Sequence, residues 1–441
     1  MSLPRYPKYK ASGVEWLGEV PEHWEVKPNK TFLTHSQKLV GESWKERQLL
    51  SLTLKGVIDR DIHSGHGKYP SDFGTYQEVA VGDLVFCLFD MDETPRTVGL
   101  AGSVGMITSA YDVFRCRSTA LANFVVYYFL HIDSFKGLRP FYTGLRKVVR
   151  PPTFMSIKVP MPPIGEQTKI ASFLDRETSK IDGLVGEQRR LIELLKEKRQ
   201  AVISHAVTKG LNPHTPLKPS GIEWLGDVPT AWTVTKLGRA AFMQEGPGLR
   251  TWQFTDEGTR VICVTNITES GIDFARLEKF ISTDEYNSSY THFTVQTGDV
   301  LLSSSGNSWG KVAIYEGDEK VMLNTSTIRL NESAGSPLIR DFLAILLQSD
   351  TIREQLGLAM TGSCQPNFGP SHLKSVMVAV PSRQEQSNIV AFVARETAKL
   401  DALTAEAERG IELLQERRTA LISAAVTGQI DVRGLVETEA A

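Results

Sequence analysis

The sequence predicts an α+β protein built from two mixed α/β domains and two long antiparallel helices that pair as a coiled coil. Three observations lead to this fold class. A short phrase with two tryptophans occurs twice, as SGVEWLGEVPEHW at 12–24 and as SGIEWLGDVPTAW at 220–232. A long helix-forming segment also occurs twice, and a stretch of mixed β-type and helical runs precedes each copy. The chain therefore contains an internal repeat of one fold.

The two long helices are predicted from residues 166–208 and 385–427, which align without a gap and share about 24 of 43 residues. Each segment is rich in helix-forming residues and contains no Pro, which favours a single helix roughly 60 Å long. Mostly apolar residues recur every seven positions, and this spacing forms a seam for a partner helix. The predicted helix-pair interface consists of Leu174, Ile181, Leu195 and Val202 in the first copy and Val393, Leu400, Leu414 and Leu421 in the second. The alternative is that each helix packs separately on its own domain.

Outside these helices, residues 25–160 and 233–380 each combine short β-type runs with turn signals and a helical run, near 119–136 and 337–357. The first helix leads into the second copy of the phrase, whereas the sequence that should follow the second helix is found at the N-terminus. This arrangement predicts a pseudo-two-fold repeat with circular organisation. The predicted segments are a first domain with its N-terminal junction at 1–160, a first helix at 161–211, a second domain at 212–380, a second helix at 381–430 and a tail at 431–441.

The composition is that of an ordinary globular protein, with 41% apolar and 23% charged residues in a chain of 441 residues, enough for two to three domains. No apolar run approaches the length of a membrane span and no signal-peptide core is present, so a cytoplasmic location is expected. The four cysteines stand far apart, which argues against a disulfide framework or a zinc site. Because the net charge is only −2, any DNA-binding surface must be a local patch.

No catalytic or metal-binding motif is found in the sequence. The segment GNSWGK at 306–311 is one spacer residue short of a phosphate-binding loop and lacks the following Ser or Thr. His63 and His66 have no Cys or carboxylate at ligand spacing. The serines at 303–305 lack a nucleophile-elbow frame. We therefore expect a non-catalytic chain that binds no metal or cofactor itself.

Two groups of residues are candidates for contact with DNA. The first lies in an acid-free segment at 136–150, where cations suited to phosphates are interleaved with Phe141 and Tyr142. The second combines amides and cations that can pair with base edges, in turn-rich segments of the second domain. The candidates are Lys136, Arg139, Arg146, Lys147 and Arg150 in the first group and Arg250, Asn307, Trp309, Lys311, Gln365 and Asn367 in the second. The alternatives are an ordinary solvated basic face and ordinary turn residues.

These features together resemble the specificity (S) subunits of type I restriction-modification systems. The resemblance spans nearly the whole chain. Its most specific element is the Pro-x-x-x-Glu-Gln run that leads into each long helix, in PMPPIGEQTKIASFLDRETSKID and VPSRQEQSNIVAFVARETAKLD. The resemblance implies two target-recognition domains, each reading one half of a split, asymmetric sequence in double-stranded DNA. It also implies that the two helices set the spacer between the halves and dock two modification subunits.

The resemblance further implies which chemistry belongs to other subunits. Adenine methylation with S-adenosylmethionine would take place in the modification (methyltransferase) subunits. Cleavage with ATP and Mg would take place in the restriction (endonuclease and translocase) subunits. Two other functions stay open: a non-catalytic coiled-coil adaptor that does not bind DNA, and a hydrolase or methyltransferase in its own right, which the missing motifs disfavour.

Overall fold

The chain divides into two compact units in the computed structural model, which describes residues 3–61, 72–332, 335–359 and 367–435. Unit 1 consists of residues 1–188 and 409–441, and unit 2 consists of residues 189–408. Both boundaries fall inside long helices, α3 (Ile164–Lys209) and α9 (Arg383–Val426), so each unit contains half of each helix. Each helix begins two residues before the segment from which it is predicted, 166–208 or 385–427, and ends within one residue of it.

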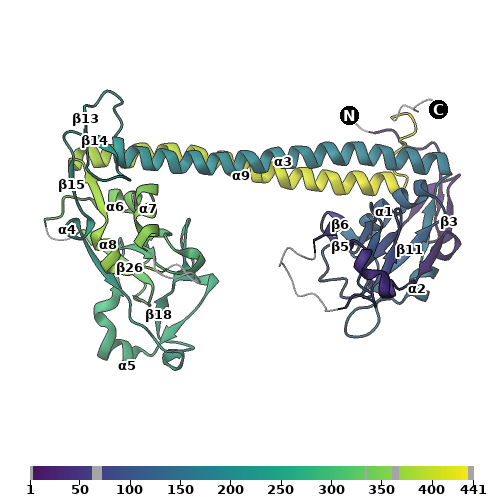
Figure 1. The fold of residues 1–441 in the computed structure, drawn as a ribbon, viewed down its shortest axis with the longest axis horizontal. Helices are drawn as coiled ribbons and strands as arrows, with labels where there is room; N and C mark the ends of the chain where they lie inside the picture. The colour runs from purple at the N-terminus through teal and green to yellow at the C-terminus, as the bar shows by residue number, and fades with distance from the viewer. Residues whose placement is uncertain (1–2, 62–71, 333–334, 360–366, 436–441) are drawn as a thin grey trace. The chain divides into compact units, whose positions relative to one another are not determined.

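Unit 1 contains a four-stranded antiparallel sheet in the order β4-β11-β8-β9. Helix α1 (Thr119–Ser134) packs against this sheet, and Figure 1 shows it between the sheet and the long helices. The shared core is aromatic, because Phe86 contacts both Phe114 and Phe129 edge to face. The strands are β4 (Leu33–Ser36), β8 (Leu84–Phe86), β9 (Val98–Leu100) and β11 (Asp112–Cys116).

A second sheet of unit 1 has the order β6-β5-β10-β7, in which β5 and β10 are parallel. A separate ladder of β3 (Glu25–Pro28) and β12 (Lys158–Met161) joins the two ends of the domain. The chain therefore enters and leaves this domain at one place. The other elements are β1 (Tyr9–Ala11), β2 (Glu19–Pro21), β5 (Leu49–Thr53), β6 (Gly56–Arg60), β7 (Gln77–Val79), β10 (Gly105–Ile107) and α2 (Pro151–Ser156).

Unit 2 repeats this topology. Its sheet β16-β26-β23-β24 corresponds to β4-β11-β8-β9 in order and direction, and its parallel pair β18–β25 corresponds to β5–β10. The ladder of β15 and β27 corresponds to β3 and β12. The strands of these two sheets are β16 (Ala241–Glu245), β17 (Phe254–Thr255), β18 (Thr259–Ile262), β21 (Phe280–Ile281), β22 (Thr294–Val295), β23 (Val300–Ser303), β24 (Val312–Ile314), β25 (Val321–Leu323) and β26 (Thr327–Glu332). The repeat therefore extends from sequence to topology.

The helical run predicted near 337–357 is in fact two helices, α6 (Arg340–Leu347) and α7 (Asp350–Ala359). Ser204 of α3 accepts a hydrogen bond from the Asp350 amide at 2.9 Å and donates one to the Asp350 carboxylate at 3.0 Å. This contact fixes the start of α7. Because its partners are far apart in the chain, local helix propensity could not predict it. The remaining elements of unit 2 are β13 (Leu217–Pro219), β14 (Asp227–Pro229), β15 (Thr233–Lys236), α4 (Leu237–Ala240), β19 (Ile267–Thr268), β20 (Gly271–Ile272), α5 (Thr283–Glu285), α8 (Pro370–Ser375) and β27 (Met377–Val380).

The repeated tryptophan phrase anchors each domain to the start of a long helix. In unit 1 the buried Trp24 donates a hydrogen bond to Glu166 at 2.7 Å. In unit 2 the buried Trp232 donates one to Glu385 at 3.0 Å. Glu166 and Glu385 occupy the same position of the Pro-x-x-x-Glu-Gln run. The tryptophan phrase and this run therefore occur together in both copies, because a tryptophan of the phrase donates a hydrogen bond to the glutamate of the run.

A weaker sequence echo, Gly-Asp at 82–83 and again at 298–299, forms the same turn in both units. Gly82 and Gly298 have φ angles of +85° and +92°, a conformation that glycine adopts without strain. The carboxylate that follows is buried and pairs with an arginine of the neighbouring strand. Asp83 lies 2.9 Å from Arg115, and Asp299 lies 3.4 Å from Arg329. A buried carboxylate needs such partners, which explains why these residues are kept in both copies.

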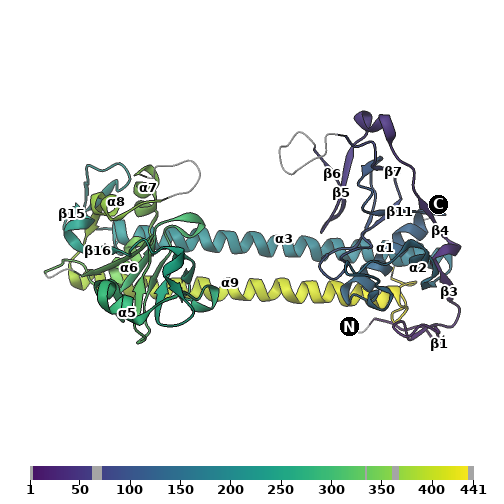
Figure 2. The same cartoon turned by 90° about the horizontal axis from the view of Figure 1, so that it is seen from below.

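The two half-helices lie side by side within each unit (Figures 1 and 2). Buried residues recur along each helix at alternating spacings of four and three positions. In α3, Thr178 and Val185 are buried between and after the predicted positions Leu174 and Ile181. Among the predicted interface residues, Leu174, Ile181, Leu195, Val393 and Leu400 are buried, and Val202, Leu414 and Leu421 are half-buried.

No helix in the described part of the chain is long and apolar enough to cross a membrane. Cys87, Cys116 and Cys263 are free thiols. The fourth cysteine, Cys364, lies outside the described residues, as do His63 and His66.

Candidate nucleic-acid interface

The predicted basic segment of unit 1 folds into a tight hairpin, which we call the basic hairpin and define as residues 139–150. Thr143 and Val148 pair through two backbone hydrogen bonds of 2.9 and 3.0 Å and enclose a four-residue turn. Gly144 and Lys147 both have positive φ angles, +70° and +48°. A lysine rarely adopts this conformation, so the turn is held by its surroundings and not by local preference alone.

Those surroundings are an acidic loop between β8 and β9, defined as residues 88–94. Its carboxylates pair with the basic hairpin: Asp90 with Arg146 at 2.6 Å, Asp92 with Arg139 at 3.0 Å and Glu93 with Lys147 at 2.8 Å. Backbone hydrogen bonds join the same two segments, from Asp90 N to Arg146 O and from Val149 N to Leu88 O, each at 2.8 Å. The hairpin and the loop therefore form one cross-linked structure.

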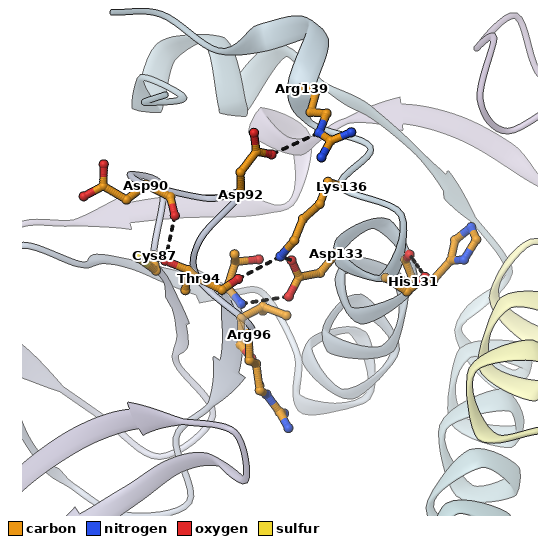
Figure 3. A network of polar contacts seen from close by, with 12 residues as sticks. Cys87, Asp90, Asp92, Thr94, Arg96, His131, Asp133, Lys136 and Arg139 are labelled. Carbon is orange, nitrogen blue, oxygen red and sulfur yellow. Dashed lines mark hydrogen bonds and ion pairs between the residues drawn. The ribbon is translucent and has the colours of Figure 1, made fainter. Parts of the chain in front are cut away.

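The base of this structure is tied to the end of α1 by Lys136 (Figure 3). Its ammonium group donates to Asp133 and to the Thr94 carbonyl, both at 2.7 Å. Asp133 also accepts the backbone N–H of Thr97 at 2.8 Å. Lys136 is thus mostly engaged inside the protein, and we expect it to position the acidic loop and not to contact a ligand.

The ion pairs of the basic hairpin lie at the surface, so their cations are accessible to a ligand. The side chains of Arg139 and Arg146 are 63% and 69% exposed. Hydrogen bonds from Arg139 and Lys147 hold the pKa of Asp92 below its usual range, so this carboxylate is ionised at neutral pH. Exposed pairs of this kind contribute little to stability by themselves, and an exposed guanidinium keeps further N–H groups that can bind a phosphate while it stays paired. Arg150 makes no ion pair with any described residue.

The candidates of unit 2 are brought together only in part. The loops that follow β23 and β25 meet, since Ser304 N donates to Ser326 O at 2.9 Å, and Phe368 N donates to Ser304 O at 3.1 Å. Asn367, which is exposed, pairs with Ser305 in an isolated β-bridge. Trp309 and Lys311 lie in the same loop after β23, and Arg250 is exposed in the loop after β16. The side chain of Asn307 and all of Gln365 lie outside the described structure.

Two residues of this cluster were not predicted from the sequence. The Arg353 guanidinium lies 5.3 Å from the ring centre of Trp309, and Phe368 meets that ring edge to face at 6.4 Å. Both contacts join segments far apart in the chain, so no local motif signals them. They hold the half-buried Trp309 ring in one orientation, and a rigid aromatic ring can stack on a base.

The comparisons with known proteins give these loops a context. Residues 229–413 match the family described as the type I restriction modification DNA specificity domain. The MjaVIII specificity subunit of a type I restriction enzyme from Methanocaldococcus jannaschii is 25% identical over 339 residues, which cover 76% of each chain. This chain is similar to the specificity subunits of type I restriction enzymes. The EcoBI specificity subunit of Escherichia coli is 23% identical to it, over 65% of this chain and 61% of the relative.

Solved structures share the fold of this chain. A chain from a study of the assembly and conformational transition of the type I R-M system matches with a TM-score of 0.69 and 13% identity, over 92% of this chain and 98% of the other. The HsdS subunit from Thermoanaerobacter tengcongensis matches with a TM-score of 0.50 and 14% identity, over 93% of this chain and 98% of the other.

These relatives are specificity subunits, the non-catalytic components of type I restriction-modification enzymes. In the described ranges, no three His, Cys, Asp or Glu side chains are grouped so that they could hold a metal ion. A cavity of about 710 Å³ in unit 2 has five carboxylates in its lining and no cation, which disfavours nucleic acid there. The lining carboxylates are Glu269, Glu316, Asp318, Glu319 and Asp341. The candidate interface therefore remains the loops described above.

Proposed function

We propose that each of the two domains of this chain reads one half of a bipartite, asymmetric sequence in double-stranded DNA. The observation that carries the proposal is one topology with two different sets of site loops. The sheets, the Trp–Glu anchors and the Gly-Asp turns recur in both units. In contrast, unit 1 presents the basic hairpin, and unit 2 presents Trp309 with Arg353 and Asn367. Similar scaffolds with different contact loops suit two different half-sites.

The helices, in this proposal, pair as an antiparallel coiled coil about a pseudo-two-fold axis and set the spacer between the half-sites. One ion pair supports the symmetry because it occurs twice at equivalent positions of the repeat. Asp182 lies 3.1 Å from Arg418 in unit 1, and Arg199 lies 3.0 Å from Asp401 in unit 2. The circular organisation is supported within unit 1, where Asp431 N donates to Pro4 O at 2.7 Å and so joins the two terminal segments.

We further propose that the helices dock two modification subunits. Exposed leucines support this, again at equivalent positions of the repeat: Leu184 and Leu403 are 47% and 53% exposed, and Leu194 and Leu413 are 48% and 59% exposed. Each unit carries one leucine from each helix. Two equivalent pairs of exposed leucines on one chain fit two copies of one partner. In the proposal, those partners hold S-adenosylmethionine and methylate adenine, and restriction subunits use ATP and Mg, all in the cytoplasm.

Methylation mapping tests the proposed function. A host that expresses this subunit with its modification subunit is expected to carry N6-methyladenine at one split, asymmetric motif with a fixed gap. The control is the same host with the modification subunit alone, which should show no such motif. If an assembled complex with S-adenosylmethionine leaves the genome unmodified and binds all DNA equally, the adaptor function replaces this one.

Charge placed on one apolar surface should remove one of the two modification subunits. Leu184 and Leu413 both belong to unit 1, and the Asp182–Arg418 pair places them within about one helical turn of each other. We expect the double variant Leu184→Glu, Leu413→Glu to weaken one docking event about 10- to 100-fold, because two leucines no longer become buried. Native mass spectrometry should then show one partner where the wild type shows two. Leu217→Glu on β13, which is 48% exposed, is the control, and loss of both partners or of neither would contradict the proposal.

A further inference from the structure

Among the residues of unit 1 that the structure describes, the most exposed large apolar side chain is at the tip of the basic hairpin. Leu145 is 102% exposed, in the turn that Thr143 and Val148 close. A single exposed leucine is common on protein surfaces and needs no function of its own. The position of this leucine is the informative feature, because the structure beneath it is rigid and charged.

The rigidity comes from contacts on both sides of the tip. Arg146, the next residue, pairs with Asp90 at 2.6 Å, and its guanidinium lies 5.0 Å from the centre of the Phe89 ring. Val149, at the base of the hairpin, is completely buried. The acidic loop thus acts as a brace for the basic hairpin. An apolar tip that cannot fold back stays exposed until another molecule covers it.

The chemistry around Leu145 selects the kind of molecule that covers it. Its neighbours in the turn are Gly144 and the cations Arg146 and Lys147, so the tip is an isolated apolar point and not part of an apolar patch. A protein partner generally needs a broader apolar area than one side chain. A DNA duplex fits one protruding aliphatic group flanked by cations. The cations can bind backbone phosphates, and the aliphatic group can insert between stacked bases.

We propose that Leu145 is a wedge that inserts between base pairs of the duplex in the first half-site, with Arg146 and Arg139 on the flanking phosphates. The proposal rests on the proposed function, since it requires that unit 1 binds DNA. It assigns a separate role to the acidic loop, which holds the wedge in place. In the sequence repeat Leu145 aligns with Ser363, a residue outside the described structure, so the wedge is assigned to the first half-site alone.

The experiment uses the complete complex with its modification subunits and the target duplex found by methylation mapping. The adenine analogue 2-aminopurine is placed in turn at each base step of the first half-site and, in a separate duplex, at the methylated adenine. We expect fluorescence to rise at one step other than the methylated adenine when the wild type binds, because insertion unstacks the bases there. In Leu145→Ala this rise should disappear, while the rise at the methylated adenine, which reports base flipping, should remain.

Binding measurements complete the test. Leu145→Ala should bind the target about tenfold more weakly and random duplex less than about twofold more weakly, since phosphate contacts are unchanged. Leu145→Met should keep both the fluorescence signal and the affinity. Leu54→Ala, at a turn residue that is 69% exposed, is the matched control and should behave as the wild type.

Two results would overturn the wedge and leave the proposed function intact. One is specific binding by the wild type with no unstacked step besides the methylated adenine, and the other is an unchanged unstacking signal in Leu145→Ala. If the wild-type complex does not distinguish the target from random DNA, the proposed function itself fails, and the wedge fails with it. The signal at the methylated adenine separates these cases.

Discussion

Exchanging residues 29–157 for the corresponding segment of a relative is expected to replace the first half of the DNA target and to leave the second half and the spacer unchanged. Unit 2 keeps its own sheet and site loops in such a chimera, because it contains no residue of the exchanged segment. Preference for the new sequence over the old should change by at least about 10³-fold, the usual difference between specific and non-specific binding. Methylation mapping of the chimera in a host without the parent enzyme measures both half-sites and the gap together.

The ends of the exchanged segment follow from the β3–β12 ladder. A cut at 25 and 160 would divide this ladder, because Glu25 pairs with Met161. Cutting between β3 and Asn29 and between Ile157 and β12 retains the whole ladder as a stem. The new segment should supply an equivalent of Asn29, whose side-chain amide donates to Phe154 O at 2.8 Å. The reciprocal exchange in unit 2, between β15 and β27, is the control and should alter the second half alone. A chimera that alters both halves would contradict independent reading.

The repeated architecture could be predicted because the same residues make the same contacts twice. Glu166 and Glu385 are identical in sequence, and each accepts a hydrogen bond from a buried tryptophan of the repeated phrase. The β-type runs at 83–89, 111–116 and 299–304 lie where β8, β11 and β23 are found. An internal repeat allows one half of the chain to be compared with the other. Residues that are the same in both halves indicate contacts that both domains make.

The site could not be predicted to the same depth because its charges meet across long distances in the chain. The segment at 136–150 contains no acid, so its cations were expected to be available for phosphate. In the structure they pair with Asp90, Asp92 and Glu93, which are nearly fifty positions away for Arg139 and more than fifty for Lys147. Sequence spacing shows which charges are present, whereas only the fold shows which of them are already paired.

Burial along the two long helices shows the same limit in a milder form. A period of seven identified the row that contains Leu174 and Ile181, both of which are buried. It did not identify the alternate row, because Thr178 is polar and breaks the apolar pattern. Thr178 is tolerated there since its hydroxyl donates to the Leu174 carbonyl at 2.6 Å, which satisfies the buried oxygen inside the helix.

Replacing Trp24 by alanine is expected to destabilise unit 1 by about 3–5 kcal/mol, the usual cost of deleting a buried tryptophan. Trp24 is completely buried in the main core of that unit and contacts Phe124 edge to face. Its loss also removes a hydrogen bond to Glu166, a carboxylate that is only 9% exposed. Thermal unfolding followed by calorimetry should show a lower transition temperature for unit 1. The change Trp24→Phe, which keeps most of the apolar volume, should cost about 1–3 kcal/mol through the lost hydrogen bond.

The chain supplies its own controls for this prediction. Trp252 is 79% exposed, so Trp252→Ala removes a side chain of the same size and should change the free energy of unfolding by less than about 0.5 kcal/mol. Trp232→Ala removes the equivalent anchor of unit 2 and should destabilise that unit to a similar degree. Glu166 keeps other partners when Trp24 is lost, since His23 lies 2.7 Å and Arg433 3.5 Å from it. The cavity therefore accounts for most of the cost, and a similar loss of stability in Trp24→Ala and Trp24→Phe would show instead that the hydrogen bond to Glu166 dominates.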